Sequence, residues 1–147
     1  MERKFLLDRL PEGAEDGNVI VDKYLVGTSL RLRRIESEPP QYKFTQKETP
    51  MPPDYATTTI TNIYLSAEEY ELLSALPGRE LRKTRHHLDR YAIDVFEGPL
   101  EGLTLAEISF TTDGEMRAHP TPDFAVDEVS EDERYTGGWL AANGLPS

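Results

Sequence analysis

The sequence contains no cysteine and no long apolar run. Without cysteine, disulfides, a thiol nucleophile and thiolate-based zinc or iron–sulfur sites are excluded. No segment approaches the ~20 apolar residues that a membrane-spanning helix needs. The N-terminal stretch MERKFLL has no apolar signal-peptide core before a small-residue cleavage site. We therefore expect a cytoplasmic protein that does not associate with a membrane.

Basic charge is also scarce, because 16 Lys and Arg stand against 27 Asp and Glu, for a net charge of −11. Nucleic-acid binding needs a basic surface, so no nucleic-acid partner is expected. The phosphate-loop pattern G-x-x-x-x-G-K-[ST] is absent from the sequence. Net charge does not describe a recessed site, however, since local charges dominate there.

The chain of 147 residues, 37% of them hydrophobic, is long enough for one core. We expect a single domain over residues 1–147. A proline-rich loop is predicted at 49–54, too short to separate two domains.

Residues alternate between polar and apolar along much of the chain, which is typical of half-buried strands. The pattern predicts eight strands, over 2–7, 19–26, 28–36, 41–48, 57–65, 79–88, 90–98 and 102–110. Turns are expected at Gly27 and Asp89. Because short links join most of these strands, the fold class predicted is mainly β (α+β), an antiparallel sheet or closed barrel.

Three short helices are predicted beside the strands. Ser66 and Glu69 form a capping-box pattern for a helix over 66–76. Ser130 and Glu133 repeat the pattern and predict helix near 130–135, followed by another near 138–142. Trp139 is expected to pack this last helix against the barrel.

The segment LRLRR at 30–34 places Arg31 and Arg33 on one face of a strand and leucines on the other. For one strand alone, a solvated outer face is the ordinary explanation. However, four strand segments are dominated by Lys and Arg although the whole chain is acidic. Inward-facing cations would line a cavity suited to a polyanion, since arginine forks and lysine ammonium groups bind phosphate oxygens. Carboxylates in the same cavity would hold Mg²⁺ or Mn²⁺.

The sequence resembles the CYTH domain, or triphosphate tunnel metalloenzyme family, in its short bacterial type. The resemblance extends over nearly the whole chain and rests on ERKFLL, LRLRR, FTQKE, LRKTRHHL, AIDVFEGPLEGLTLAEISF and DEVSEDERYTGGWLA. It implies an eight-stranded antiparallel barrel that forms a tunnel with a few short α-helices. It also implies a small-molecule triphosphate substrate and Mg²⁺ or Mn²⁺; a homodimer is left open.

Site residues follow from the resemblance, position by position. The catalytic positions are Lys4 and Asp94. The metal-binding positions are Glu2, Glu107 and Glu128. The phosphate-binding positions are Arg31, Arg33, Lys47, Lys83, Arg85 and Arg134.

Three acidic positions of the family pattern differ here. The first glutamate of E-x-E-x-K falls before Met1, Ser109 replaces the second glutamate of E-x-E, and Asn62 stands where many members have glutamate. The prediction is metal-dependent hydrolysis of inorganic tripolyphosphate or of a nucleoside or thiamine triphosphate. Because the acids are thinned, two alternatives stay open: a catalytically weak or inactive domain that binds triphosphate or nucleotide, and a class IV-type adenylate cyclase.

The two adjacent histidines do not add a metal site. His86 and His87 point to opposite faces of a strand, which excludes a local two-histidine pair. A surface or packing role is the expectation for both.

Overall fold

The computed structural model of the protein describes residues 1–48 and 59–147. The loop predicted at 49–54 lies outside the described residues, as do residues 57 and 58 of the fifth predicted strand. No helix in the described ranges is long and apolar enough to cross a membrane.

Nine strands form one antiparallel sheet in the described part of the chain. In spatial order the sheet runs β5-β4-β3-β2-β6-β7-β8-β1-β9. The strands are β1 (Glu2–Leu7), β2 (Asn18–Leu25), β3 (Leu30–Ile35), β4 (Gln41–Glu48), β5 (Thr59–Leu65), β6 (Gly78–Leu88), β7 (Tyr91–Phe96), β8 (Thr104–Ser109) and β9 (Asp127–Glu128).

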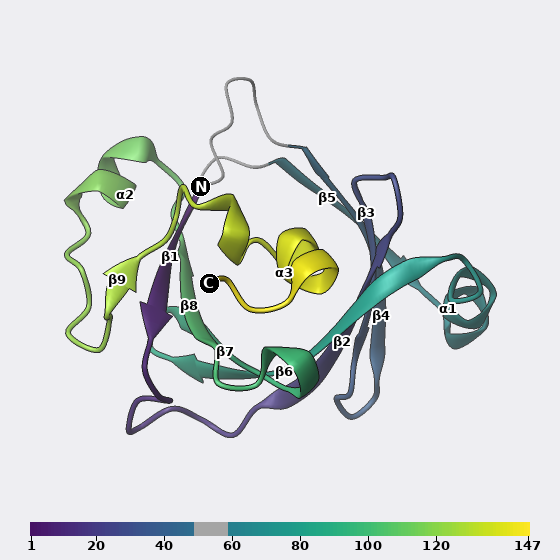
Figure 1. Cartoon of the computed structure of the whole chain (residues 1–147), viewed down its shortest axis with the longest axis horizontal. Coiled ribbons are helices and arrows are strands. Elements are labelled where there is room, and N and C mark those ends of the chain that lie inside the picture. Colours follow the sequence, from purple (N-terminus) through teal and green to yellow (C-terminus); the bar gives the residue numbers. More distant parts are fainter. Residues whose placement is uncertain (49–58) are drawn as a thin grey trace.

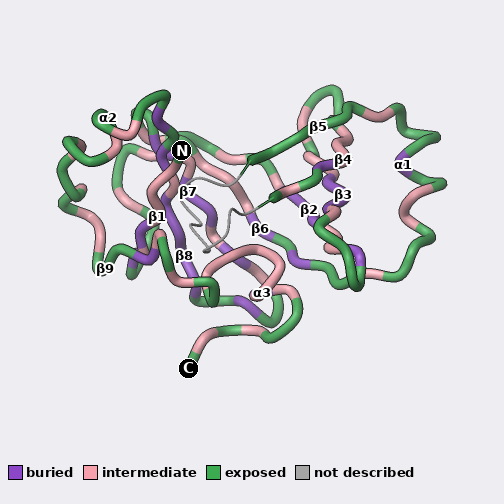
Figure 2. Tube along the Cα trace, turned by 90° about the horizontal axis from the view of Figure 1, so that it is seen from above, coloured by how far each residue is buried: buried purple, intermediate pink, exposed green. Residues whose placement is uncertain are grey.

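Short helices connect or follow these strands. They are α1 (Ala67–Leu73), α2 (Asp113–Ala118) and α3 (Gly137–Asn143), with 3₁₀ turns η2 (Gly98–Leu100) and η3 (Glu133–Tyr135). The sheet curls so that its strands surround a central space, and α3 lies over one end of that space (Figure 1). From the side, α3 and the C-terminus project below the strands (Figure 2).

The predicted mainly β, antiparallel fold is confirmed, and each of the eight predicted strands has a counterpart in β1–β8. Two details differ from the prediction. A short ninth strand, β9, pairs with the edge of β1, where Phe5 lies opposite Glu128. The described residues therefore form an unclosed sheet with β5 and β9 at its two edges, rather than a fully hydrogen-bonded ring.

The helices predicted over 66–76 and near 138–142 are present as α1 and α3, and the helix predicted near 130–135 is present as the shorter 3₁₀ turn η3. Ser66 caps α1, and the Glu69 side chain in turn accepts from the Ser66 backbone N–H at 2.8 Å. Thr136 caps α3. The prediction of a Ser130 cap was wrong: Asp132 caps η3 instead. The Ser130 hydroxyl accepts from the Lys4 backbone N–H at 2.9 Å, so it joins the C-terminal segment to β1.

Side chains alternate between two apolar clusters and a polar interior. On the outer face of β1, β7 and β8, Phe5, Ile93 and Ile108 are fully buried or nearly so under the segment that contains α2. Residues of the opposite parity, such as Leu105 and Phe96, pack with Leu140 of α3 at one end of the central space. Trp139 lies against this second cluster, as predicted. The two clusters fix β6–β8 between α2 and α3 and leave the remaining inner face of the sheet for the site.

Candidate functional site

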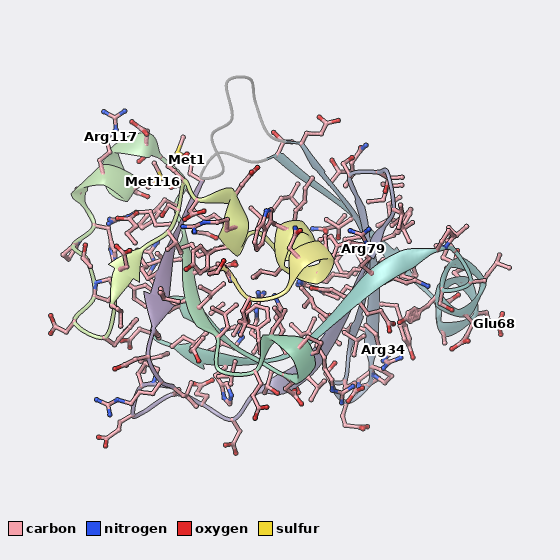
Figure 3. The ribbon with its side chains drawn as sticks, viewed as in Figure 1. Met1, Arg34, Glu68, Arg79, Met116 and Arg117 are labelled. Atoms are coloured by element: carbon pink, nitrogen blue, oxygen red, sulfur yellow. The ribbon has the colours of Figure 1, made fainter. Side chains whose placement is uncertain are left out.

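A cavity of about 450 Å³ lies inside the curled sheet. Its lining comes from alternate residues of β1–β8, as the period of two in a strand requires. Helices α1 and α2 contribute nothing to it, and side chains such as Glu68 and Arg117 project from them away from the interior (Figure 3). An adjoining cavity of about 230 Å³ reaches from the same basic residues to the C-terminal segment before α3.

The structure brings most of the predicted site residues to this cavity. Eight of them line it, contributed by the five strands β1, β3, β4, β6 and β8: Glu2, Lys4, Arg31, Arg33, Lys47, Lys83, Arg85 and Glu107. A ninth, Asp94, lies 1% exposed directly behind Lys83 and Arg85. The guanidinium and ammonium groups therefore converge on one interior, and the ordinary reading of a solvated outer face does not hold for them.

Asp22 of β2 organises three of these cations. Its side chain is 0% exposed and accepts two hydrogen bonds from Arg33, from Nε at 2.6 Å and from Nη2 at 2.8 Å. Arg31 Nε and Lys83 Nζ lie 3.8 and 3.9 Å from its oxygens. Burial opposes ionisation of Asp22, but Arg33, Lys83 and Arg31 together hold its pKa well below the ordinary value. Asp22 is therefore an anion that holds strands β2, β3 and β6 in register around their cations.

Asp94 of β7 does the same for the next pair. Arg85 donates from Nε and Nη2 to its two oxygens at 2.7 and 2.8 Å, and Lys83 Nζ lies at 2.9 Å. Burial again opposes ionisation, yet Lys83 and Arg85 hold the pKa of Asp94 well below its ordinary value. With both oxygens occupied by cations, Asp94 is a positioning group for Lys83 and Arg85.

Arg31 of β3 is only partly satisfied by hydrogen bonds in the cavity. Its Nη2 donates to the Thr45 hydroxyl at 3.1 Å, and Thr45 donates onward to Asn62 at 2.7 Å. Its Nε is a buried polar atom with no hydrogen-bond partner among the described residues. A buried N–H without a partner is unfavourable by about 1–3 kcal/mol. An anion in the cavity could accept a hydrogen bond from the Nε–H of Arg31 and so remove this cost.

Lys47 of β4 lies among other cations and forms no close ion pair with an acid in the described ranges, although the charge of Glu107 acts on it. Burial first, and then the neighbouring Arg31, lower the pKa of its ammonium group to about 7. The side chain is therefore poised to change charge near neutral pH, and a bound anion would favour its protonated form.

The two acidic residues of the cavity, Glu2 and Glu107, lie where β1 pairs with β8, and Lys4 lies beside them. Lys4 Nζ lies 3.5 Å from Glu107 Oε1 and donates to the Tyr135 carbonyl at 2.9 Å. Burial would raise the pKa of Glu107, but Lys4 and Arg85 lower it to about 2. Burial and the charge of Glu107 raise the pKa of Glu2. Two carboxylates that repel one another in this way would be stabilised by a shared cation.

These two carboxylates are the residues that fit a divalent metal. Asp22 and Asp94 are already held by arginine forks, and no group of three or more His, Cys, Asp or Glu side chains in the described chain is arranged to hold a metal ion. Mg²⁺ needs only one or two carboxylates when substrate phosphates and waters complete its octahedron. Glu2 and Glu107 therefore suit a metal that is shared with a phosphate ligand.

One end of the cavity is covered by α3. Tyr24 of β2 lies directly against this helix, because a Cβ added at Gly137 would overlap the Tyr24 hydroxyl and would stand 2.7 Å from its Cζ. Burial raises the pKa of Tyr24 to about 12, so its hydroxyl stays protonated at neutral pH. A glycine at position 137 is thus what allows α3 to sit against the Tyr24 ring.

Two predicted site residues are not brought to the cavity. Glu128 faces the outer side of β1, where it is joined to Arg3 by hydrogen bonds of 2.9 and 2.7 Å. Position 128 lies opposite Phe5, an outward-facing residue, and this parity directs Glu128 away from the interior. Arg134 is exposed and forms a local fork with Asp132. Neither residue belongs to the candidate site.

Sequence reasoning missed Asp22, Tyr24 and Thr45. Asp22 carried a signal, because a lone carboxylate in the apolar strand VIVDKYLV requires a buried cation. Thr45 was noticed only as the residue between two lysines, and its role depends on Arg31 across the strand pair. His87 was expected at the surface or in packing. It is exposed, and it also lines the cavity.

No family model matches the chain. The sequence is 29% identical to a protein named inorganic triphosphatase from Nitrosomonas europaea, over 160 aligned residues that cover 96% of this chain and 95% of the relative. The crystal structure of the inorganic triphosphatase NE1496 matches with a TM-score of 0.66 at 27% identity, covering 99% of this chain and 96% of that one.

More distant structures share the architecture. The PH1819 protein from Pyrococcus horikoshii matches with a TM-score of 0.55 at 16% identity, over 80% of this chain and 82% of that chain. At this level of identity the likeness concerns the fold alone.

Proposed function

We propose that the protein is a CYTH-type triphosphatase that hydrolyses a triphosphate in the cavity inside its sheet, with inorganic tripolyphosphate favoured over ATP and thiamine triphosphate. The relative named inorganic triphosphatase supports this choice, since it aligns with this chain over nearly its whole length. The matching structure of an inorganic triphosphatase supports it as well.

The observation that carries the proposal is the charge of the cavity. Eight Lys or Arg side chains line it and two Glu side chains do so, although the whole protein has a net charge of −11. Within this set, Arg31 keeps a buried N–H that no group in the described chain accepts. A cavity of this kind, recessed from water, concentrates a compact polyanion much more strongly than an exposed basic surface.

The residues take the following roles in this proposal. Phosphate oxygens are held by Arg31, Arg33, Lys47, Lys83 and Arg85. Asp22 and Asp94 keep the cations in place. Lys4 is close enough to Glu107 to orient a phosphate or the attacking water beside it. Water attacks the terminal phosphorus, the phosphoanhydride bond breaks, and orthophosphate and pyrophosphate leave. Positioning and charge neutralisation account for most of such catalysis.

We propose Mg²⁺ or Mn²⁺ as the cofactor, held by Glu2 and Glu107 together with phosphate oxygens. A divalent ion there would neutralise charge on the phosphates and activate water. The cytoplasm is the proposed location, because a chain without cysteine carries no disulfide that would mark an oxidising compartment.

The test is a substrate panel: tripolyphosphate, ATP and thiamine triphosphate, each with Mg²⁺ or Mn²⁺, with orthophosphate, pyrophosphate and cyclic AMP measured together. We expect phosphate release, fastest from tripolyphosphate, and its loss in Arg31→Ala. Arg82→Ala is the matched control, since Arg82 lies on the same sheet but faces outward near Glu36 and Glu97. Absence of phosphate from every substrate with either metal would refute the proposal, and cyclic AMP from ATP would replace it with a cyclase.

One observation favours a second candidate, a domain that binds triphosphate without fast turnover. Only Glu2 and Glu107, among the acids lining the cavity in the described ranges, are available to a metal. Calorimetry that detects tripolyphosphate binding, together with no phosphate release in the panel, would select this candidate.

A further inference from the structure

The two ends of the cavity differ. Helix α3 covers one end, where Leu140 packs on Phe96 and Leu105. At the other end β4 begins and β6 turns into β7. Three basic side chains line the cavity there, Lys43, His87 and Arg90, and we call them the mouth. His87 and Arg90 are exposed and Lys43 is half-buried, so this end is open to solvent.

Lys43 carries an unneutralised charge. Its Nζ lies 5.5 Å from the centroid of the Tyr64 ring, and no acidic side chain in the described ranges pairs with it. Burial lowers the pKa of its ammonium group, and so do Arg33, Arg31 and Arg85. Surrounded by cations, Lys43 would gain from a neighbouring anion.

Arg90 is held at the opposite side of the mouth. Its Nη2 donates to the Ser109 carbonyl at 2.9 Å, and its Cζ lies 5.3 Å from the Phe110 ring. These contacts fix the guanidinium plane at the rim and use only one of its five N–H groups in the described structure. The remaining donors can bind an anion that extends out of the cavity.

The deeper cations form a separate set. Arg33, Lys83 and Arg85 are held by Asp22 and Asp94, and Arg31 and Lys47 complete that group. Toward α3, the adjoining cavity adds no Lys or Arg of the described chain to the Lys4, Arg31 and Lys47 that line both cavities, and it adds the carboxylate of Asp132. Among the described residues that line the two cavities, further basic side chains lie at the mouth, so a longer phosphate chain would extend past Lys43, His87 and Arg90.

We propose that the mouth is a subsite for a fourth phosphate, so that the protein prefers linear polyphosphates of four or more units over tripolyphosphate. This inference rests on the proposed function, since it assumes a phosphate chain in the cavity. Each additional unit brings negative charge next to cations that lack an acidic partner.

The experiment compares kcat/KM for tripolyphosphate and tetrapolyphosphate in the wild-type protein, Lys43→Ala, Arg90→Ala and the outward-facing control Arg82→Ala. In the wild type we expect tetrapolyphosphate to be preferred by about tenfold, as one charge-assisted contact allows. Lys43→Ala and Arg90→Ala should each remove most of this preference, whereas Arg82→Ala should keep it. Circular dichroism melting verifies that each variant is folded.

The outcomes separate the two ideas. Hydrolysis of tripolyphosphate with no wild-type preference for tetrapolyphosphate would overturn the mouth subsite and leave the proposed function intact. An equal loss with both substrates in the mouth variants would also overturn it, because general attraction of anions does not depend on chain length. If neither substrate is hydrolysed, the proposed function fails, and calorimetric affinities for the two chains then decide the subsite.

Discussion

Arg33 and Asp22 form a two-point ion pair inside the sheet, with the two nitrogens of the guanidinium edge 2.6 and 2.8 Å from the two carboxylate oxygens. The residues lie directly opposite one another on β3 and β2. Neither is exposed by more than 6%. The pair is an inner support of the cavity, and its removal would leave an uncompensated charge in a dry environment.

Asp22→Asn tests this support. The substitution keeps the shape of the side chain but leaves Arg33, Arg31 and Lys83 without their shared anion. We expect the free energy of unfolding to fall by about 3–5 kcal/mol, the range found when one partner of a buried pair is removed. Urea unfolding followed by the fluorescence of Trp139 measures it. Asp8→Asn, an exposed change of the same kind, should leave the midpoint where it is. A loss below ~1 kcal/mol in Asp22→Asn would contradict the role given to the pair.

Asp94 predicts how stability depends on acid. Its pKa is held below the ordinary value in the folded protein, so folding favours the ionised form. The stabilisation is present above the unfolded pKa of ~3.9 and is lost as the pH falls through the lower folded value. Urea midpoints measured from pH 7 to pH 3 should therefore fall steeply below about pH 4. Asp94→Asn should start lower and show a shallower decline. Parallel curves for the two proteins would argue against Asp94 as a source of acid sensitivity.

The fold was predictable because its strands carry a clear period of two, and the capping box of Ser66 and Glu69 fixed the start of α1. Short elements were not predictable in the same way. The two residues of β9 have no pattern of their own, since they form a strand only because β1 offers a free edge. Ser130 was predicted as a helix cap, but its hydroxyl bonds to the backbone of β1 instead. The residue types that cap helices also form such bonds to a neighbouring strand, so the pattern alone does not separate the two.

The site was predictable where one strand carried two cations, as in LRLRR. The anions behind those cations were harder to assign. Asp22 interacts with residues 9, 11 and 61 positions along the chain, and such distances are set by strand order. The sequence did not show that Glu128 faces away from the cavity, because one step of register against β1 exchanges the inner and outer faces of a strand. The charged residues of a strand therefore indicated which of its faces lines the cavity. The acidic partners of those residues depended on which strands pair in the sheet.

Lys47 predicts a pH dependence of anion binding. With a pKa lowered to about 7, its ammonium group is charged at pH 6 and mostly neutral at pH 8.5 in the free protein. Because phosphate favours the charged form, the affinity for tripolyphosphate should weaken above pH 7, by up to about tenfold per pH unit. Lys47→Arg does not titrate in this range and serves as the control, since the ionisation of tripolyphosphate itself affects both proteins alike. Calorimetry without metal measures both, and identical pH profiles would rule out Lys47 as the titrating group.

The contact between Tyr24 and α3 predicts a difference between two adjacent glycines. In Gly137→Ala the new Cβ would overlap the Tyr24 hydroxyl, so α3 must shift, and we expect a loss of about 1–3 kcal/mol. In Gly138→Ala the nearest Tyr24 atom would be 3.6 Å away, an ordinary contact, and the protein should unfold at the same or a higher temperature. Adding Tyr24→Ala to Gly137→Ala should recover part of the loss. Equal stabilities of the two alanine variants would contradict the packing described for α3.

A substitution at Ser109 tests whether the small number of carboxylates in the cavity limits its affinity for a divalent metal. It lies opposite Glu2 in the pairing of β1 with β8 and lines the cavity two residues from Glu107. In Ser109→Glu a third carboxylate would join Glu2 and Glu107, and burial together with the charge of Glu107 already raises the pKa of Glu2. Without metal the variant should therefore unfold at a lower temperature than the wild type. With Mn²⁺ present, we expect tighter binding of the ion, measured by electron paramagnetic resonance, by about tenfold.

The change Ser37→Glu, at a half-buried position far along the chain from β8 and outside the lining of both cavities, is the matched control for added charge. It should change neither quantity. If Ser109→Glu binds Mn²⁺ no better than the wild type, Glu2 and Glu107 do not hold the ion, and the metal must be placed elsewhere. If it binds more tightly and phosphate release from tripolyphosphate also rises, the number of carboxylates limits turnover. Tighter binding with unchanged turnover would place the limit in the basic half of the cavity, where Arg31 and Lys47 meet the phosphates.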